Sequence, residues 1–234
     1  MKTPSSSIQD YLKAIYALEE ECSPAPVTTS LLADRLGVSR PSVTGMLQKM
    51  ASASPKLVEY LRYQGVRLTP AGTKVALEVI RHHRLIESYL SKALDFPWDE
   101  VHHEADLLEH VISEALEARI AEKLGHPELD PHGQPIPRRD GTVSQRGEVR
   151  LSELDPGTVA VVCRVSDQDP DILRYLDQLG IHLSTRIEVT DRAPFDGPLH
   201  VRLDSQATHA LGRRVTDRVY VLQVEEPSRS STHG

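Results

Sequence analysis

Residues 28–50, with the sequence TTSLLADRLGVSRPSVTGMLQKM, decide the fold because they predict two short helices joined by a tight turn. Thr28 or Thr29 can cap the first helix, and Gly37 suits the position just beyond its last turn. Ser39 can cap the second helix. The predicted apolar faces of the two helices consist of Leu31, Leu32, Leu36, Val43, Leu47 and Met50. Two helices joined by a three-residue turn with glycine are typical of a helix-turn-helix.

The segments on either side extend this pattern. Apolar residues recur at helical spacing between residues 8 and 18, which predicts an amphipathic helix before the pair. Residues 58–63 and 66–68 predict a β-hairpin around Gln64-Gly65. A hairpin directly after a helix-turn-helix indicates a winged helix, in which one helix enters the major groove and the hairpin touches the DNA backbone. The alternative is a helical bundle that binds another protein.

The predicted recognition helix and hairpin carry side chains suited to DNA. Short hydroxyls and guanidinium groups can contact phosphates and base edges. The candidate DNA-binding residues are Ser39, Arg40, Pro41, Ser42, Thr44, Arg62 and Arg67. Residues 1–75 hold nine lysines and arginines against six acidic residues, whereas the whole chain has a formal charge of -7. This balance favours local phosphate contacts and argues against a protein that coats nucleic acid non-specifically.

The middle of the chain is acidic and rich in histidine. Residues 76–141 hold fourteen acidic residues, seven basic ones and seven of the eleven histidines. Two long helices are predicted here, over residues 70–94 after a Thr69 cap, and from Asp99 to about Leu124. On the second helix His102, Asp106, Glu109 and His110 are spaced to share one face, and the first helix offers His83 and Glu87 four residues apart. Clustered carboxylates repel one another unless a cation neutralises them, so a metal site is predicted. The alternative is a purely structural cluster.

The donor types indicate the class of metal. Carboxylates and imidazoles without a thiolate favour Mn(II) or Fe(II) over Cu(I) or structural zinc, although most such sites hold zinc more tightly than manganese. The two cysteines, Cys22 and Cys163, share no short motif, which argues against a cysteine zinc site and a disulfide framework. A metallohydrolase is disfavoured because the sequence has neither a His-Glu-x-x-His zinc motif nor a nucleophile motif.

The C-terminal third predicts a second kind of structure. Residues 125–147 are rich in proline and glycine and are interpreted as a linker. Beyond it lie one short predicted helix over 171–179 and strand-like runs at 158–165, 186–190, 199–203 and 219–224. They predict a small β-barrel, so the fold class is mainly α with a small β domain. The sequence shows no signal peptide and no stretch long enough to span a membrane, from which a soluble, cytoplasmic protein is expected.

Taken together, these motifs resemble the family of the diphtheria toxin repressor and the manganese transport regulator, over nearly the whole chain. The resemblance rests on Asp10-Tyr11-Leu12, Ile15-Tyr16, Ser39-Arg40-Pro41-Ser42-Val43-Thr44, Leu68-Thr69-Pro70-Ala71-Gly72, His83-Arg84-Leu85 with Glu87, Glu109-His110, and Pro131-His132-Gly133 with Pro135-Ile136-Pro137. It implies a winged helix-turn-helix over residues 1–74 and a helical metal-binding and dimerisation domain over 75–141. It further implies a linker and an SH3-like (FeoA-like) barrel over 142–234.

The resemblance also implies two metal sites. The first would use Asp10, Asp106, Glu109 and His110, with His83 close by. Iron-responsive family members place methionine and cysteine where this chain has Asp10 and Asp106, so the resemblance points to the manganese-responsive branch. The second site would draw on Glu87, His102, Asp130, His132 and Asp169. Lys13 stands where some manganese regulators place a carboxylate, and Ile172 replaces a polar ligand of some family barrels.

By this resemblance the chain is a metal-dependent transcriptional repressor of metal-uptake genes and not an enzyme. Mn(II) is the expected cofactor, with Fe(II), Zn(II), Co(II) and Cd(II) as alternatives in vitro. The expected partners are palindromic double-stranded operator DNA and a second copy of the chain, with no membrane and no small-molecule substrate. An iron(II)- or zinc-responsive regulator is one alternative. A DNA-binding protein that needs no metal is another.

Overall fold

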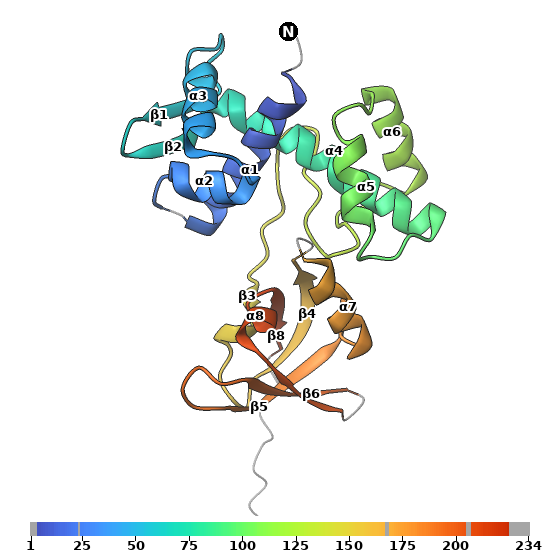
Figure 1. Ribbon diagram of the computed structural model, residues 1–234. Helices are drawn as coiled ribbons and strands as arrows, with labels where there is room; N and C mark the ends of the chain where they lie inside the picture. The colour runs from blue at the N-terminus through green and yellow to red at the C-terminus, as the bar shows by residue number, and fades with distance from the viewer. Residues whose placement is uncertain (1–3, 23, 167–168, 205–206, 225–234) are drawn as a thin grey trace, which may run out of the picture. The chain divides into compact units, whose positions relative to one another are not determined.

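A computed structural model describes residues 4–22, 24–166, 169–204 and 207–224 (Figure 1). The chain divides into two compact units. The first comprises Met1–Ile86, Ala105–His126 and Ile136–Val143, and the second comprises Glu87–Glu104, Pro127–Pro135 and Ser144–Gly234. Two of the helices contribute to both units, so this division differs from the three expected domains, whose boundaries stay a prediction.

The first unit begins with a helix-turn-helix. Its helices are α1 (Ser6–Cys22), α2 (Thr29–Leu36) and α3 (Arg40–Ala51). The Thr28 side chain accepts a hydrogen bond from the Leu31 amide, Gly37 ends α2 with φ 63°, and the Ser39 side chain caps α3. The predicted caps are therefore confirmed. Leu31, expected on the apolar face, is 42% exposed, because two-turn α2 buries Leu32 and Ala33 instead.

The predicted hairpin follows as β1 (Val58–Leu61) and β2 (Gly65–Leu68). The strands are antiparallel, with Val58 opposite Leu68 and Leu61 opposite Gly65. The turn therefore consists of residues 62–64, where Gln64 and Gly65 were expected. Val66 exchanges two backbone hydrogen bonds with Val27, at 2.9 and 3.1 Å, which ties the hairpin to the segment before α2. This arrangement is a winged helix.

Three further helices are α4 (Pro70–Leu94), α5 (Val101–Leu108) and α6 (Glu114–Lys123). The Thr69 hydroxyl caps α4 by accepting from the Gly72 amide. The single helix expected from Asp99 to Leu124 is wrong, because the chain turns between α5 and α6. Ser113 caps the new helix through the Leu116 amide, and Glu114 and Glu117 lie favourably in its first turn.

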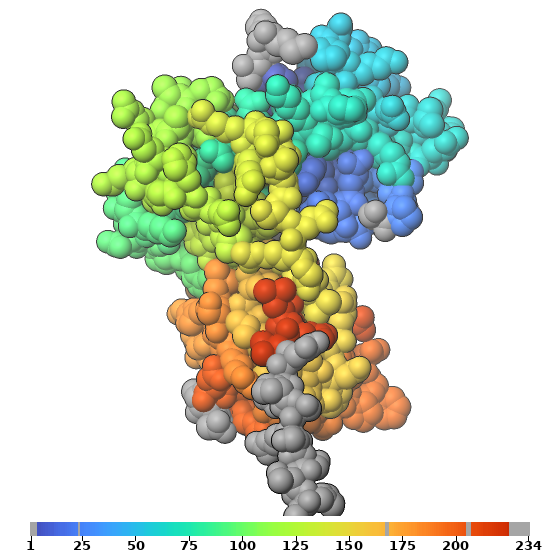
Figure 2. All heavy atoms as spheres, turned by 180° about the vertical axis from the view of Figure 1, so that it is seen from behind, coloured from blue at the N-terminus to red at the C-terminus, as the bar shows by residue number. Residues whose placement is uncertain are grey.

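The predicted linker is also wrong in part. Residues 127–135 belong to the second unit and 136–143 to the first. Asp130, His132 and Ile136 are buried. The Pro137 carbonyl accepts a hydrogen bond from Arg81 Nη1 at 2.8 Å. The chain around Pro137, yellow in Figure 2, therefore lies against α4. Proline and glycine here form tight turns that pack on the protein and do not form a free tether.

The β domain of the second unit is a six-stranded antiparallel sheet with strand order β3-β8-β4-β5-β6-β7. Its elements are β3 (Val149–Arg150), η1 (Leu151–Glu153), β4 (Val159–Val165), α7 (Pro170–Gln178), β5 (Arg186–Arg192), β6 (Leu199–Leu203), β7 (Thr208–Leu211), α8 (Arg213–Thr216) and β8 (Val219–Gln223). The four predicted strands and α7 are confirmed. Ile172 is 6% exposed and packs in the barrel core.

Among the described helices, none has the length and apolar character needed to cross a membrane.

Replacing Gly72 by alanine should destabilise the protein. A Cβ atom there would lie 2.0 Å from the Leu57 carbonyl oxygen, so backbone must shift, at a cost of about 2–3 kcal/mol. Gly45→Ala is the matched control, because its Cβ meets nothing within 4 Å and alanine favours a helix interior by about 0.5–1 kcal/mol. Urea unfolding followed by circular dichroism measures both. Equal stability of the two variants would contradict the packing at Gly72.

Candidate metal centre

His110 lies between two carboxylates of the first unit. Its Nε2 atom is 2.7 Å from Asp10 Oδ1 on α1 and 3.5 Å from Glu109 Oε1 in the turn after α5. Its Nδ1 atom is 2.7 Å from Gln9 Oε1, and an amide oxygen can only accept a hydrogen bond. Nδ1 therefore carries a hydrogen, and Nε2 points toward the two carboxylates. Fixing an imidazole through its other nitrogen is typical of metal ligands.

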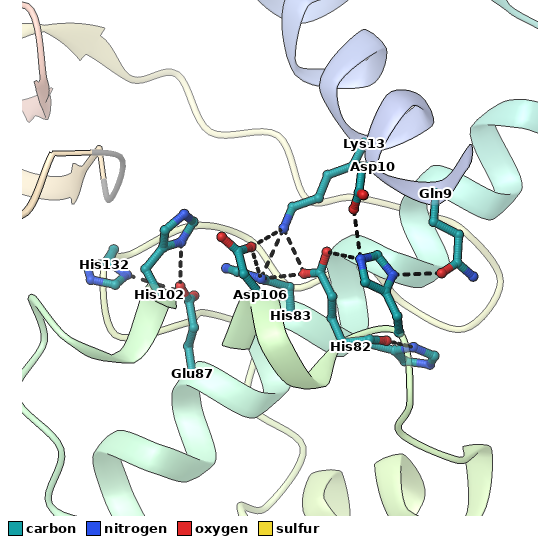
Figure 3. A network of polar contacts seen from close by, with 11 residues as sticks. Gln9, Asp10, Lys13, His82, His83, Glu87, His102, Asp106 and His132 are labelled. Atoms are coloured by element: carbon teal, nitrogen blue, oxygen red, sulfur yellow. Dashed lines mark hydrogen bonds and ion pairs between the residues drawn. The ribbon is translucent and has the colours of Figure 1, made fainter. Parts of the chain in front are cut away.

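Lys13 places an ammonium group among the other predicted ligands (Figure 3). Its Nζ atom is 2.7 Å from Glu109 Oε2, 3.0 Å from Asp106 Oδ1 and 3.0 Å from His83 Nδ1. Burial alone would lower the pKa of Lys13, but the Glu109 and Asp106 charges outweigh it and the pKa is raised. The ammonium is thus a fixed positive charge inside the cluster.

Glu109 joins these two groups of contacts. Its side chain is only 2% exposed. Oε1 faces His110, whereas Oε2 contacts Lys13 and lies 2.5 Å from His83 Nδ1. Burial opposes its ionisation, but the hydrogen bond from His83 and the charge of Lys13 lower the pKa of Glu109. The expectation that Glu109 and His110 share a helix face with Asp106 was wrong, since both lie in a turn. The turn still brings them beside Asp10.

A second cluster lies in the second unit. Glu87, Asp130 and His132 are buried, and one ligand atom from each falls within 4.8 Å of the others. His132 Nε2 is 2.6 Å from the Trp98 carbonyl, an acceptor, so Nε2 carries the hydrogen and Nδ1 faces Glu87 Oε2 at 3.9 Å. His102 adds its Nδ1 atom 3.1 Å from Glu87 Oε1. Four of the five predicted residues are thus close together.

Asp169, the fifth, is engaged elsewhere, which corrects its expected place in the second site. It caps α7, and its Oδ2 accepts from Arg214 Nη2 at 2.6 Å. The Arg214 hydrogen bond lowers the pKa of Asp169. In the described part of the chain, Asp169 belongs to no group of ligand-type side chains that could hold a metal.

The predicted DNA-binding residues lie on α3 and the hairpin, and all but the partly buried Thr44 are exposed. Several are held locally. Ser39 and Ser42 contact each other through their hydroxyls at 2.8 Å, and Thr44 donates to the Arg40 carbonyl. Arg67 donates to the Pro24 carbonyl, which holds the hairpin against the segment before α2. The Arg62 guanidinium lies over the Tyr63 ring, 5.0 Å from its centroid.

Sequence reasoning missed Gln9 and His82. Each adjoins a predicted ligand in sequence, which was the available signal. Gln9 is buried and orients His110, while His82 Nδ1 lies 3.3 Å from the Glu109 carbonyl oxygen. Both residues therefore position atoms of the first cluster.

Models of three protein families match successive parts of the chain. They are the iron dependent repressor N-terminal DNA binding domain over residues 4–66, the iron dependent repressor metal binding and dimerisation domain over 69–138, and the FeoA domain over 149–223. The order agrees with the expected winged helix, helical domain and small barrel, so the predicted fold class is confirmed.

Individual proteins are similar over most of the chain. The iron-dependent repressor of Mycobacterium leprae is 36% identical over 192 residues, which are 76% of this chain and 81% of that protein. The diphtheria toxin repressor of Corynebacterium diphtheriae is 28% identical over 97% of this chain and 100% of its own length. A solved manganese-dependent transcriptional repressor in complex with manganese is 40% identical, with a TM-score of 0.86 over 93% of this chain and all of that one.

The family is one of DNA-binding repressors and not of enzymes, as expected from the sequence. Family relatives that bind metal include the repressor ScaR, whose structure with Zn²⁺ is 28% identical with a TM-score of 0.80 over 94% of this chain and 100% of that one. This chain belongs to the diphtheria toxin repressor family of metal-dependent transcriptional repressors.

Proposed function

We propose that Mn(II) is the metal that activates this repressor for operator binding. The observation that carries the proposal is the contact of Asp10 Oδ1 with His110 Nε2, because it joins α1 of the DNA-binding head to the turn after α5. When bound, the metal supplies a cation that Asp10, Glu109, His110 and Asp106 would hold, with His83 alongside. The donors are carboxylate oxygens and imidazole nitrogens without sulfur, a set that suits Mn(II).

The residues around the site would act by fixing the head in place. Asp10 moves with α1, whereas His110 and Glu109 move with the α5–α6 turn, so holding the three together stiffens that junction. Two recognition helices of a dimer must sit roughly 34–36 Å apart, or a multiple of this, to read successive major grooves. A dimer that reaches this spacing only part of the time binds its palindromic operator more weakly by that fraction.

The dimer surface is proposed to include the exposed apolar side chains around the α5–α6 turn. These are Leu107, Leu108, Val111 and Leu116, with exposures from 41 to 75%. These four large apolar groups within ten residues would be covered by the same patch of a second copy. The proposed domains are the winged helix-turn-helix over residues 1–74, the metal-binding and dimerisation domain over 75–141, and the linker with the barrel over 142–234. The proposed role is repression of metal-uptake genes.

Iron(II) is the second candidate for the activating metal. The M. leprae relative, 36% identical, is named an iron-dependent repressor, whereas the solved manganese-dependent repressor is 40% identical. Fe(II) accepts the same oxygen and nitrogen donors as Mn(II). Asp10 and Asp106 favour manganese between the two, because iron-responsive family members place methionine and cysteine at these positions.

Asp10→Asn should abolish most of the manganese effect on operator affinity. The change keeps the shape of the side chain but removes the charge that binds the head to the metal. We expect manganese to tighten wild-type binding about 5- to 150-fold, the usual range of allosteric coupling, and the variant by less than about threefold. Fluorescence anisotropy with operator DNA at fixed salt, titrated with Mn²⁺, Fe²⁺ or chelator, measures it.

Asp34→Asn is the matched control, since Asp34 is an exposed carboxylate on α2 of the same head. It should leave the ratio of affinities with and without manganese unchanged. If Asp10→Asn retained the wild-type ratio, the proposed junction would be wrong. Equal operator binding of the wild type with manganese and with chelator would overturn metal activation itself.

Lys13 limits the first cluster to one divalent ion. Asp10, Asp106 and Glu109 carry three negative charges, and the ammonium of Lys13 removes one, which leaves a charge that one divalent ion balances. The ammonium lies between Asp106 and Glu109, where a second ion would have to bind. Placing two metals and an ammonium within a few ångströms would be strongly repulsive.

Lys13→Glu should let the first cluster take a second manganese ion. The substitution removes the positive charge and adds a carboxylate, so the bound manganese should rise by one ion per chain. Equilibrium dialysis counts the ions, and electron paramagnetic resonance should show a spin-coupled Mn(II) pair. Lys74→Glu, an exposed position on α4, is the control and should bind as the wild type does. An unchanged count in Lys13→Glu would contradict the charge argument.

The second site is proposed to use Glu87, His102, Asp130 and His132 without Asp169. Glu87→Gln should therefore remove one bound metal ion per chain, measured by calorimetric titration. Asp169→Asn should keep the metal count and instead lower thermal stability slightly, because an exposed Asp–Arg pair with Arg214 contributes about 0.2–1 kcal/mol. Loss of a metal ion in Asp169→Asn would restore Asp169 as a ligand.

A further inference from the structure

A third group of ligand-type side chains lies on the other face of α4 from Lys13. Glu78 and His82 are four residues apart on α4, and Glu114 is the first residue of α6. One ligand atom from each falls within 4.8 Å of the others. Figure 3 shows the His82 ring pointing away from Lys13. None of the three residues belongs to either site above.

The His82 ring is held in one orientation. Nδ1 lies 3.3 Å from the Glu109 carbonyl oxygen, which can only accept, so Nδ1 carries a hydrogen. Nε2 then faces the opposite way. The side chain is 9% exposed, and within the residues that the structure describes Nε2 has no hydrogen-bond partner. A buried nitrogen of this kind is costly unless something binds it.

The groups that face His82 Nε2 are carboxylates. Glu114 Oε1 lies 3.5 Å away and Glu117 Oε2 3.9 Å away. A lone pair facing carboxylate oxygens is repulsive unless a proton or a metal ion lies between them. Two ligands about 2.0–2.2 Å from one tetrahedral ion are about 3.3–3.6 Å apart, which matches the distance to Glu114.

The charges nearby leave room for one divalent ion. Glu117 is already balanced, with Arg81 Nε 2.8 Å from Oε1 and Arg139 Nη2 3.5 Å from Oε2. Among the described residues, neither Glu78 nor Glu114 forms an ion pair with a lysine or arginine. Their two negative charges equal the charge of a single divalent cation.

We propose that His82, Glu78 and Glu114 form a third divalent-metal site, with Glu117 beside it. Imidazole and carboxylate donors bind zinc(II) more tightly than manganese(II), so zinc is the better probe. The hydrogen bond from His82 to the Glu109 carbonyl resembles the contacts by which proteins orient ligating histidines. The third site would therefore brace the turn that carries Glu109 and His110.

The double variant Glu78→Gln/Glu114→Gln tests the site without disturbing buried His82, because both glutamates are exposed. Equilibrium dialysis against Zn²⁺ should find one fewer ion per chain than in the wild type. Circular dichroism checks that the variant folds. The control is His126→Asn, an exposed histidine with φ 55°, a conformation that asparagine tolerates, and it should retain the wild-type count.

Nitrogen-15 chemical shifts of His82 give a second readout. In the wild type, added Zn²⁺ should shift the Nε2 resonance, and in the double variant it should not. An unchanged zinc count in the double variant would overturn the proposal. So would a His82 ring that carries protons on both nitrogens and does not respond to Zn²⁺, because it would then be an ion-pair partner of Glu114 and Glu117.

Discussion

The buried carboxylate of Glu109 is the group on which the first metal cluster depends. A carboxylate that is 2% exposed must be surrounded by cations or hydrogen-bond donors, since an uncompensated buried charge costs several kcal/mol or more. Here Lys13 on α1 and His83 on α4 contact one oxygen of the carboxylate, and His110, next in sequence, lies 3.5 Å from the other. The need to satisfy one carboxylate therefore brings α1, α4 and the α5–α6 turn together. That junction is also where the DNA-binding head meets the helices that follow it.

The second cluster has a different structural setting. Asp130 Oδ1 accepts from the amides of His132 and Gln134, which folds residues 130–134 into a tight turn. The Val165 amide donates to the His132 carbonyl, and a Cβ on Gly133 would lie 2.1 Å from the Cys163 carbonyl oxygen. Only glycine at position 133 lets the turn approach β4 so closely. The turn is thus held by the barrel strand while it presents His132 to Glu87, so ligand geometry there depends on barrel packing.

Local signals in the sequence predicted most elements because capping is a local interaction. Thr28, Ser39 and Thr69 each cap the helix that the sequence assigned to them. Ser113 is an equally good cap, but the apolar spacing that continues across it favoured one long helix and hid the turn. The ligand types were predictable for a similar reason, since residues four apart share a helix face. The places of Gln9 and Asp169 were not, because they depend on contacts with His110 and Arg214, 101 and 45 residues away.

Charge balance links the three clusters and separates them from ordinary acidic surface. Each holds a formal charge of -2 when its histidines are neutral: three carboxylates and Lys13 in the first, Glu87 and Asp130 in the second, and Glu78 and Glu114 in the third. An exposed acidic patch gains little from a single ion, because water already screens its charges. In each of these clusters a buried or half-buried histidine lies beside the carboxylates and reduces their access to water, most at Glu87 and Glu109 and least at Glu78 and Glu114, which are exposed. In the proposed sites charge would limit the number of ions that each cluster holds, and Lys13 would change that number in the first cluster without being a ligand.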